Sequence, residues 1–227
     1  MQLVLKEKKQ ETPDIVSFLF ESKEPLVWKA GQFLVYTLPH ENPDDRGIRR
    51  HFTIASASHE GYVMLTVRFG KDTSTFKRIL EALSVGDTIE TVGPAGLFTV
   101  NDPEQEHVFI AGGIGITPFR AILLDLDHKN LPIKVKLLYG NRDEQILYKN
   151  ELEALAQKHD NFTIHYFIAD NRIDEEAIRK HAPDLQKPLF YVSGPEPMVR
   201  AFEKMLAEMG IPKEHIKRDY FPGYEDI

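Results

Sequence analysis

Glycines in the middle of the chain are spaced for binding a phosphate group. Residues 108–110 are an apolar run typical of a strand that is buried on both faces. Gly112, Gly113 and Gly115 follow and allow a tight turn in which the backbone comes close to a ligand. Thr117 is placed to cap the next helix, and the proline after it suits a first helical turn. We expect the free amides and dipole of that helix start to attract a phosphate or pyrophosphate.

A second strand-to-helix turn with glycine and proline lies further along the chain, at residues 193–198. Ligands of open α/β sheets bind beyond the carboxyl ends of strands, so the two turns together could bracket one dinucleotide. An ordinary structural turn is the alternative for the first one. The full dinucleotide fingerprint has a third glycine where this chain has Pro118, and the Gly-Lys-Ser/Thr ending of a Walker loop is missing.

An arginine and an aromatic residue form another candidate site in the first half. Arg50, Phe52 and Thr53 follow a polar loop, and Phe52 lies opposite Thr53 across the expected strand. An arginine pairs with a phosphate, and an aromatic ring stacks on a flat ring. The alternative is an ordinary barrel strand that carries a surface arginine.

A helix expected over residues 72–83 offers further amides to an anion. Asp72, Thr73 or Ser74 can cap it, and Lys71 lies beside this cap. The simpler hypothesis is a solvated, charged helix with an ordinary cap.

The elements around these residues change character midway. Short strands with glycine and proline punctuation predict an antiparallel barrel or sandwich in the first half. Alternating strands and helices predict βαβ units on a mostly parallel sheet in the second. The polar residues 101–106 separate expected domains of residues 1–101 and 106–227. The strands are expected from Leu3 onward and at residues 15–20, 32–38, 50–55, 62–69, 88–92, 97–100, 107–111, 133–139, 162–168, 189–193 and 216–221. The later helices are expected at residues 117–126, 144–157, 174–181 and 195–209.

Composition excludes several kinds of function. The net charge of −7 argues against nucleic acid as the main partner. The 227 residues include no cysteine, so the chain cannot hold an iron–sulfur cluster through its own thiolates. Its nine histidines show no metal-ligand spacing, and no metal site is expected. With no apolar run long enough for a bilayer and no signal-peptide core, a cytoplasmic protein without a membrane span is expected.

Taken together, these motifs resemble the ferredoxin–NADP reductase family of flavoprotein oxidoreductases over almost the whole chain. Residues 50–53, Arg-His-Phe-Thr, are similar to the family's flavin motif, Arg-x-Tyr/Phe-Ser/Thr. Residues 112–118 are similar to its pyridine-nucleotide motif, and residues 193–198 to its Cys-Gly-Pro-x-x-Met motif. The resemblance implies an N-terminal antiparallel Greek-key β-barrel followed by a parallel α/β nucleotide-binding domain.

The resemblance also implies roles for individual residues. Arg50 would pair with the flavin pyrophosphate, and Thr53 would lie near flavin N5. Ser193, which stands where the family has cysteine, would lie near the hydride path. Phe221 or Tyr224 would cover the flavin. The catalytic residues implied are Thr53, Ser193 and Tyr224. The cofactor-binding residues implied are Arg50, His51, Phe52, Thr53, Ile54, Lys71, Ser74, Thr75, Gly112, Gly113, Gly115, Thr117, Gly194, Pro195, Met198 and Phe221.

The implied cofactors are FAD, rather than FMN, and NADH or NADPH as hydride donor. NADP-specific members carry a Ser-Arg pair where this chain has Asp170 and Asn171, with Arg172 next. A carboxylate disfavours a phosphate and can accept from ribose hydroxyls, which gives a slight preference for NADH. Arg142 and Arg172 could offset it.

The implied function is hydride transfer from NAD(P)H to bound FAD, followed by release of electrons to a separate acceptor. That acceptor would be a protein such as a ferredoxin, a flavodoxin or an oxygenase component. Basic residues near the flavin motif, including Arg46 and Arg49, could dock an acidic partner. The alternatives are a reductase of free flavin or small molecules, and a non-catalytic electron-transfer subunit. The chain would be a monomer or a weak homodimer.

Overall fold

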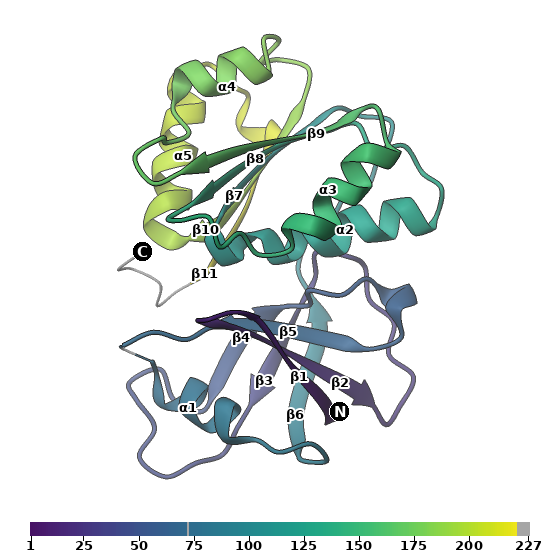
Figure 1. Cartoon of the computed structure of the whole chain (residues 1–227), viewed down its shortest axis with the longest axis vertical. Helices are drawn as coiled ribbons and strands as arrows, with labels where there is room; N and C mark the ends of the chain where they lie inside the picture. The colour runs from purple at the N-terminus through teal and green to yellow at the C-terminus, as the bar shows by residue number, and fades with distance from the viewer. Residues whose placement is uncertain (72, 222–227) are drawn as a thin grey trace. The chain divides into compact units, whose positions relative to one another are not determined.

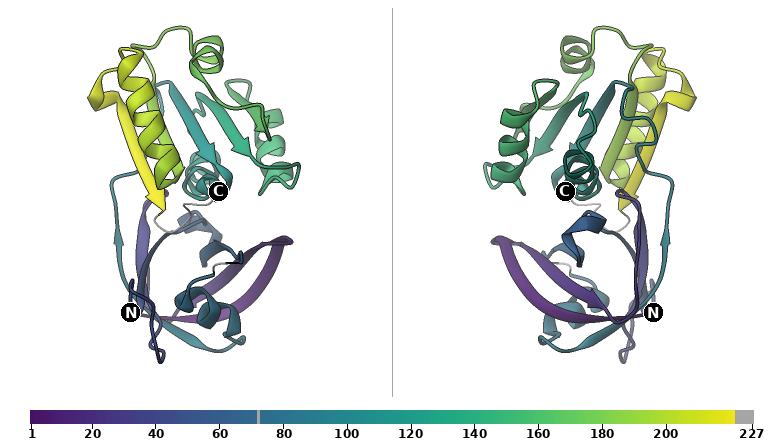
Figure 2. Two further views of the ribbon diagram at one scale, coloured as in Figure 1. Left: turned by 90° about the vertical axis from the view of Figure 1, so that its left-hand side faces the viewer. Right: turned by 90° about the vertical axis from the view of Figure 1, so that its right-hand side faces the viewer.

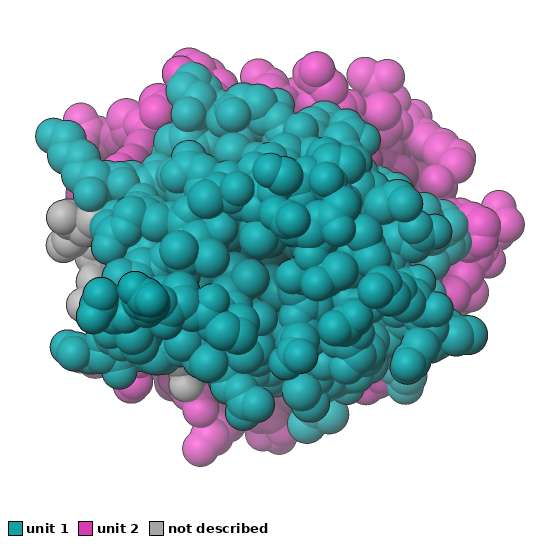
Figure 3. Space-filling view, turned by 90° about the horizontal axis from the view of Figure 1, so that it is seen from below, with its two compact units in different colours: residues 1–99 teal, residues 100–227 magenta. Residues whose placement is uncertain are grey.

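The chain forms two compact units, Met1–Thr99 and Val100–Ile227, each with its own sheet. The computed structural model describes residues 1–71 and 73–221. Figure 1 shows the elements of the chain, and Figure 3 shows the two units in different colours. The predicted fold class, an antiparallel β domain followed by a parallel α/β domain, is confirmed.

The first unit is a six-stranded antiparallel sheet in the order β4-β3-β6-β1-β2-β5. Its end strands are linked just beyond β4, where the backbone N–H of Ala55 donates to the carbonyl of Met64 at 2.8 Å. The sheet therefore closes around one apolar core, into which the helix α1 inserts Phe76 and Leu80. The elements are β1 (Gln2–Thr12), β2 (Ile15–Ser22), β3 (Phe33–Thr37), β4 (Arg49–Thr53), η1 (Ser58–Glu60), β5 (Val63–Arg68), α1 (Thr75–Ala82) and β6 (Thr88–Ala95).

The second unit is a five-stranded parallel sheet in the order β11-β10-β7-β8-β9. Its central strands β7 and β10 are buried along nearly their whole length, as expected for strands that are covered on both faces. The elements are β7 (His107–Gly112), η2 (Gly113–Ile116), α2 (Thr117–His128), β8 (Val135–Asn141), α3 (Lys149–Lys158), β9 (Phe162–Ile168), α4 (Glu175–His181), β10 (Leu189–Pro195), α5 (Glu196–Glu208), η3 (Lys213–His215) and β11 (Ile216–Phe221).

Helices cover both faces of this sheet (Figure 2). Phe109 of β7 stacks on Phe119 of α2, with ring centroids 4.5 Å apart. The neighbouring side chains Val108 and Ile110 point to the other face and join the cluster that contains α4 and α5. This alternation along β7 divides the core into two layers.

Two predicted elements differ from the observed ones. The predicted strand at residues 97–100 is wrong, because Gly96 turns the chain away from β6 with φ 109° and Leu97 is 91% exposed. The helix predicted from residue 144 begins only at Lys149. Ile146 and Leu147 are buried, but they reach the core from a loop rather than from a helical face.

Candidate functional site

Arg50 in β4 is a buried cation rather than a surface residue, so the surface alternative is wrong. Its side chain is 4% exposed. Nη1 donates to the carbonyl oxygens of Arg46, Gly47 and Arg49, each at 2.8 Å. Nη2 donates to Oδ1 of Asp44 at 2.6 Å. The guanidinium is therefore held in one orientation by the loop that precedes its own strand.

The start of α1 lies beside this arginine. Ser74 is the helix cap, and its hydroxyl accepts from the backbone N–H of Lys77 at 3.3 Å. Of the three possible caps, Ser74 is therefore the one observed, while Asp72 lies outside the described residues. Thr75, the first helical residue, donates its N–H and its hydroxyl to Oδ2 of Asp44 at 3.2 and 3.0 Å.

Several cationic side chains lie near this helix start. Lys77 donates from Nζ to the carbonyl of Arg68 at 3.0 Å. Burial lowers the pKa of Lys77 to about 8, and the neighbouring charges of Arg46, Arg50 and Arg68 contribute to this shift. Hydrogen bonds from Arg50 and Thr75 hold the pKa of Asp44 below its ordinary value, although burial opposes this. A cluster of cations at a helix start fits a phosphate or pyrophosphate.

The other side chains of the flavin motif divide between the two faces of β4. Phe52 is half-buried on the same face as Arg50, with its ring 5.9 Å from those of Tyr36 and Phe76. Thr53 is buried on the opposite face. The remaining predicted residues of this unit are His51, which is exposed, Ile54, which is buried, and Lys71, which is exposed.

The two glycine turns of the second unit meet at the point where the strand order reverses. β7 lies in the centre, β8 and β9 are added on one side, and β10 and β11 on the other. Ala111 at the end of β7 pairs with Ser193 near the end of β10. Both turns therefore leave the carboxyl edge of the sheet at its switch point, where open α/β sheets bind nucleotides.

The glycines of these two turns lie close to residues of the opposite turn. A Cβ on Gly112 would lie 2.2 Å from Sδ of Met198. A Cβ on Gly115 would lie 2.2 Å from the carbonyl oxygen of Ser193 and 2.7 Å from Cα of Gly194. At Gly115 the nearest atoms belong to the backbone, which cannot rotate away, so only glycine allows this contact between the turn after β7 and the turn after β10.

Thr117 does not cap the helix, and that prediction is wrong. The 3₁₀ turn η2 runs directly into α2, whose N-cap is Ile116. The Thr117 hydroxyl is turned back toward that turn and donates to the carbonyl of Ile114 at 3.1 Å. The turn is thus closed by the backbone of η2 rather than by a threonine cap.

Ser193 is fully buried at the end of β10. Its hydroxyl has no hydrogen-bond partner within residues 1–71 and 73–221. Gly194 and Pro195 complete the strand, and Pro195 pairs with Phe221, the last residue of β11. Tyr224 lies outside the described residues.

The residues expected to influence nucleotide choice lie at the same edge of the sheet. Asp170, Asn171 and Arg172 follow β9 and are exposed. Ala169 donates its N–H to the carbonyl of Asn141 at 3.1 Å, which ties the end of β9 to the end of β8. The exposed Asp170 carboxylate therefore lies at the carboxyl edge of the sheet.

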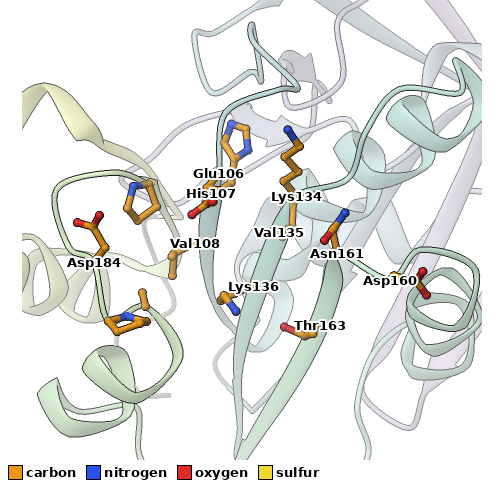
Figure 4. A pocket seen from close by; sticks show the side chains of 13 residues that line it. Glu106, His107, Val108, Lys134, Val135, Lys136, Asp160, Asn161, Thr163 and Asp184 are labelled. Carbon is orange, nitrogen blue, oxygen red and sulfur yellow. The ribbon is translucent and has the colours of Figure 1, made fainter.

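A hollow of about 480 Å³ lies at the opposite, amino-terminal edge of this sheet (Figure 4). Lys134, Lys136 and Asp160 contribute charges of both signs to its lining. Because nucleotides bind beyond the carboxyl ends of the strands, this hollow is separate from the site of the glycine turns.

Some features of the site have no sequence signal. Asp44 precedes Arg50 by six residues in a polar loop, and nothing in its spacing indicates a partner on α1. Tyr36 is fully buried, and its hydroxyl has no partner among the described residues. Its sequence position predicts only a strand.

The described part of the chain has neither a metal-binding cluster nor a membrane-spanning helix. No group of three or more His, Cys, Asp or Glu side chains in residues 1–71 and 73–221 is placed to hold a metal ion. None of the helices in those residues has the length and apolar character needed to cross a bilayer.

The first unit is a closed antiparallel sheet with a phosphate cradle, formed by Arg50 and the start of α1 at Ser74 and Thr75. The second unit has the sheet switch point at which nucleotides bind. Together these features define a class of oxidoreductases with one flavin domain and one nicotinamide domain. The oxidoreductase FAD-binding domain family matches residues 2–100, and the oxidoreductase NAD-binding domain family matches residues 109–204. The chain belongs to the ferredoxin–NADP reductase-like family of FAD- and NAD-binding oxidoreductases.

The similar proteins include reductases whose names give different electron acceptors. NADH-cytochrome b5 reductase 1 of Meyerozyma guilliermondii is 33% identical over 73% of this chain and 63% of its own length. A component of the Na(+)-translocating NADH-quinone reductase of Marinomonas sp. is 29% identical over 79% of this chain. The chain spans only 50% of that component's length. The cytochrome b5 reductase domain of Ulva prolifera nitrate reductase superposes with a TM-score of 0.83, at 27% identity and 96% coverage of both chains.

Proposed function

We propose that this chain is an NADH-dependent flavoprotein reductase that passes electrons from bound FAD to a separate protein acceptor. The observation that carries the proposal is the junction of the two glycine turns at the switch point of the parallel sheet. It is supported by a buried cation and a helix start in the antiparallel unit, which suit the phosphates of a flavin nucleotide.

The proposed roles follow from the groups that each unit presents. Arg50, Ser74 and Thr75 hold the flavin phosphates, with Lys71 and the backbone of residues 51–54 along the same cofactor. Thr53 contributes a hydroxyl near the flavin ring, and Ser193 contributes one near the nicotinamide. Bound flavin supplies the hydride-accepting and electron-donating chemistry, while the protein binds and orients the rings.

The nicotinamide nucleotide is assigned to the second unit. Gly112, Gly113, Gly115 and Thr117 line its phosphate side, and Gly194, Pro195 and Met198 border the nicotinamide. NADH is preferred because Asp170 is exposed beyond β9, where a carboxylate accepts from ribose hydroxyls and repels a 2′-phosphate.

The acceptor is proposed to be an acidic electron-transfer protein. Arg46 and Arg49 are exposed in the loop and strand next to the flavin cradle. Charges of this kind steer encounter with an acidic partner. Reversal of both charges, in the variant Arg46→Glu/Arg49→Glu, should slow electron transfer to an acidic carrier while ferricyanide reduction is retained; equal rates for the carrier would remove this docking surface.

Reconstitution tests the proposed function. The purified protein is loaded with FAD or FMN, passed through a desalting column, and assayed for ferricyanide reduction by NADH and by NADPH. We expect yellow FAD-loaded protein that turns over faster with NADH. A protein that retains neither flavin but reduces added flavin would instead be a free-flavin reductase, and a yellow protein without turnover would be an electron-transfer subunit.

A further inference from the structure

The carboxylate of Asp44 bridges Arg50 and the first turn of α1. Oδ1 accepts from Nη2 of Arg50 at 2.6 Å and from the N–H of Arg46 at 3.0 Å. Oδ2 accepts from the N–H and the hydroxyl of Thr75 at 3.2 and 3.0 Å. One oxygen of this carboxylate is thus bound by a buried guanidinium, and the other is bound by a helix start.

These donors are the ones that suit a phosphate. A guanidinium fork and the exposed amides of a helix start are strong ligands for a phosphate oxygen at neutral pH. The Asp44 carboxylate therefore binds the same donors that we propose for the flavin phosphates. Its contacts join a loop to a helix 31 residues further on, all within the first unit.

Asp44 lies among several cationic side chains. Arg46, Arg50 and Lys77 surround the helix start, and their mutual repulsion helps to lower the pKa of Lys77. Arg68, the fourth cation of this cluster, pairs with Asp14 at 3.2 Å. A group of cations of this kind also attracts an anion with more charge than one carboxylate, such as a pyrophosphate.

We propose that Asp44 is an internal counter-anion that occupies the flavin-phosphate cradle and is displaced from Arg50 and Thr75 when FAD binds. This inference rests on the proposed function. Asp44 keeps the buried Arg50 paired in the flavin-free protein, and FAD has to compete with it for the same donors. FAD affinity is therefore set partly by a residue that opposes binding.

The test compares FAD binding by the wild type and by Asp44→Asn, measured by quenching of flavin fluorescence. The amide keeps the size of the side chain but removes its charge. Because hydrogen bonds to charged groups are worth more than neutral ones, we expect the variant to bind FAD roughly tenfold more tightly. Riboflavin, which has no phosphate, should bind both proteins equally.

Asp45→Asn is the matched control. Asp45 is the exposed neighbour in the same loop, so this variant makes the same change in net charge away from the cradle. Its FAD affinity should stay within about twofold of the wild type at physiological ionic strength, where exposed charges are largely screened. An increase equal to that of Asp44→Asn would overturn the inference, because it would reflect net charge alone.

Stability provides a second readout. Without flavin, Asp44→Asn should unfold at a lower temperature than the wild type because Arg50 loses its charged partner. FAD should raise the unfolding temperature more in the variant than in the wild type. Asp44→Ser, a smaller neutral replacement, serves if the asparagine variant does not fold.

The failures of the two proposals are distinguishable. If none of the proteins binds FAD, both the proposed function and this inference fail. If wild type and Asp44 variants bind FAD equally, or the variants bind it more weakly, the reductase proposal stands and only the role of Asp44 is overturned.

Discussion

Ser193 carries a buried hydroxyl without a hydrogen-bond partner in the described part of the chain. Removing an unsatisfied buried polar group costs little, so Ser193→Ala should change the free energy of unfolding by less than about 1 kcal/mol, or raise it. The rate of flavin reduction by NADH should fall if this hydroxyl has the proposed role near the nicotinamide. Denaturant unfolding and stopped-flow absorbance measure the two effects.

Ser56→Ala is the control for stability. Ser56 is equally buried, but its hydroxyl donates to the carbonyl of Tyr62 at 2.7 Å and accepts from the N–H of Met64 at 3.0 Å. Its removal should cost about 1–3 kcal/mol. Equal losses for the two serine variants would show that Ser193 has a partner after all.

Gly115 is the glycine for which a side chain is least tolerated. The Cβ of Gly115→Ala would lie 2.2 Å from a backbone oxygen of the next turn, which cannot rotate away. We expect a loss of more than about 2 kcal/mol in unfolding free energy, together with weaker NADH binding. Gly140→Ala, whose Cβ would make only ordinary contacts at 3.6 Å, should cost far less; similar losses for both would contradict the packed junction.

His107 makes the stability of the second unit depend on pH. It is 2% exposed between Phe109 and Tyr191, and burial lowers its pKa from 6.5 to about 4, against the opposing effects of Asp102 and the backbone of Gln105. The folded state therefore favours neutral His107. Its contribution, up to about 3 kcal/mol, is fully present above pH 6.5 and is lost as the pH falls toward 4.

A comparison of unfolding free energies at pH 7 and pH 4.5 tests this effect. His107→Phe should lose less stability than the wild type over this interval, because the ring that must be protonated is gone. His128→Gln, at an exposed position on α2, should behave as the wild type. An unchanged pH dependence in His107→Phe would contradict the assignment.

At the scale of elements, α2 and α3 are joined by an ion pair between Arg120 and Glu151. Nε and Nη2 of Arg120 donate to the two carboxylate oxygens at 2.6 and 2.8 Å, and the arginine side chain is 7% exposed. Glu151→Gln should lower the unfolding free energy by about 1–3 kcal/mol, less than for a fully buried pair because Glu151 is 35% exposed.

The exposed pair Arg179–Glu175 on α4 is the control for this prediction. Its side chains are 50% and 56% exposed, so Glu175→Gln should cost less than about 0.5 kcal/mol. Thermal or denaturant unfolding of both variants gives the comparison. If the two variants lose the same unfolding free energy, burial does not strengthen the ion pair between Arg120 and Glu151.

Most elements could be predicted from the sequence because their local patterns agree with their tertiary environment. The strand at residues 216–221 is an example, whereas Ser74 is one of three residues that the sequence offers as the cap of α1. The start of α3 could not, since Ile146 and Leu147 have an apolar spacing that a buried loop satisfies as well as a helix. The Thr117 prediction failed for a related reason: its type suits a cap, but a preceding 3₁₀ turn takes its hydrogen bond.

Across the molecule, sequence motifs predict the two glycine turns, but not the contacts between them. Gly112 and Gly115 were predicted from turn chemistry, whereas their contacts with Met198 and Ser193 depend on the sheet order that makes β7 and β10 neighbours. The contact between Asp44 and Thr75 likewise joins segments that only the closed sheet brings together. Local sequence patterns do not predict such contacts between distant segments.

This chain is expected to bind FAD and to reduce it with a nicotinamide nucleotide. Anaerobic titration of the FAD-loaded protein with NADH, and in parallel with NADPH, tests it directly through the visible flavin spectrum. We predict that stoichiometric NADH bleaches the flavin rapidly and that NADPH does so more slowly. If the protein cannot be loaded with FAD, or if its bound FAD keeps the oxidised spectrum with both nucleotides, it is not a reductase of this kind.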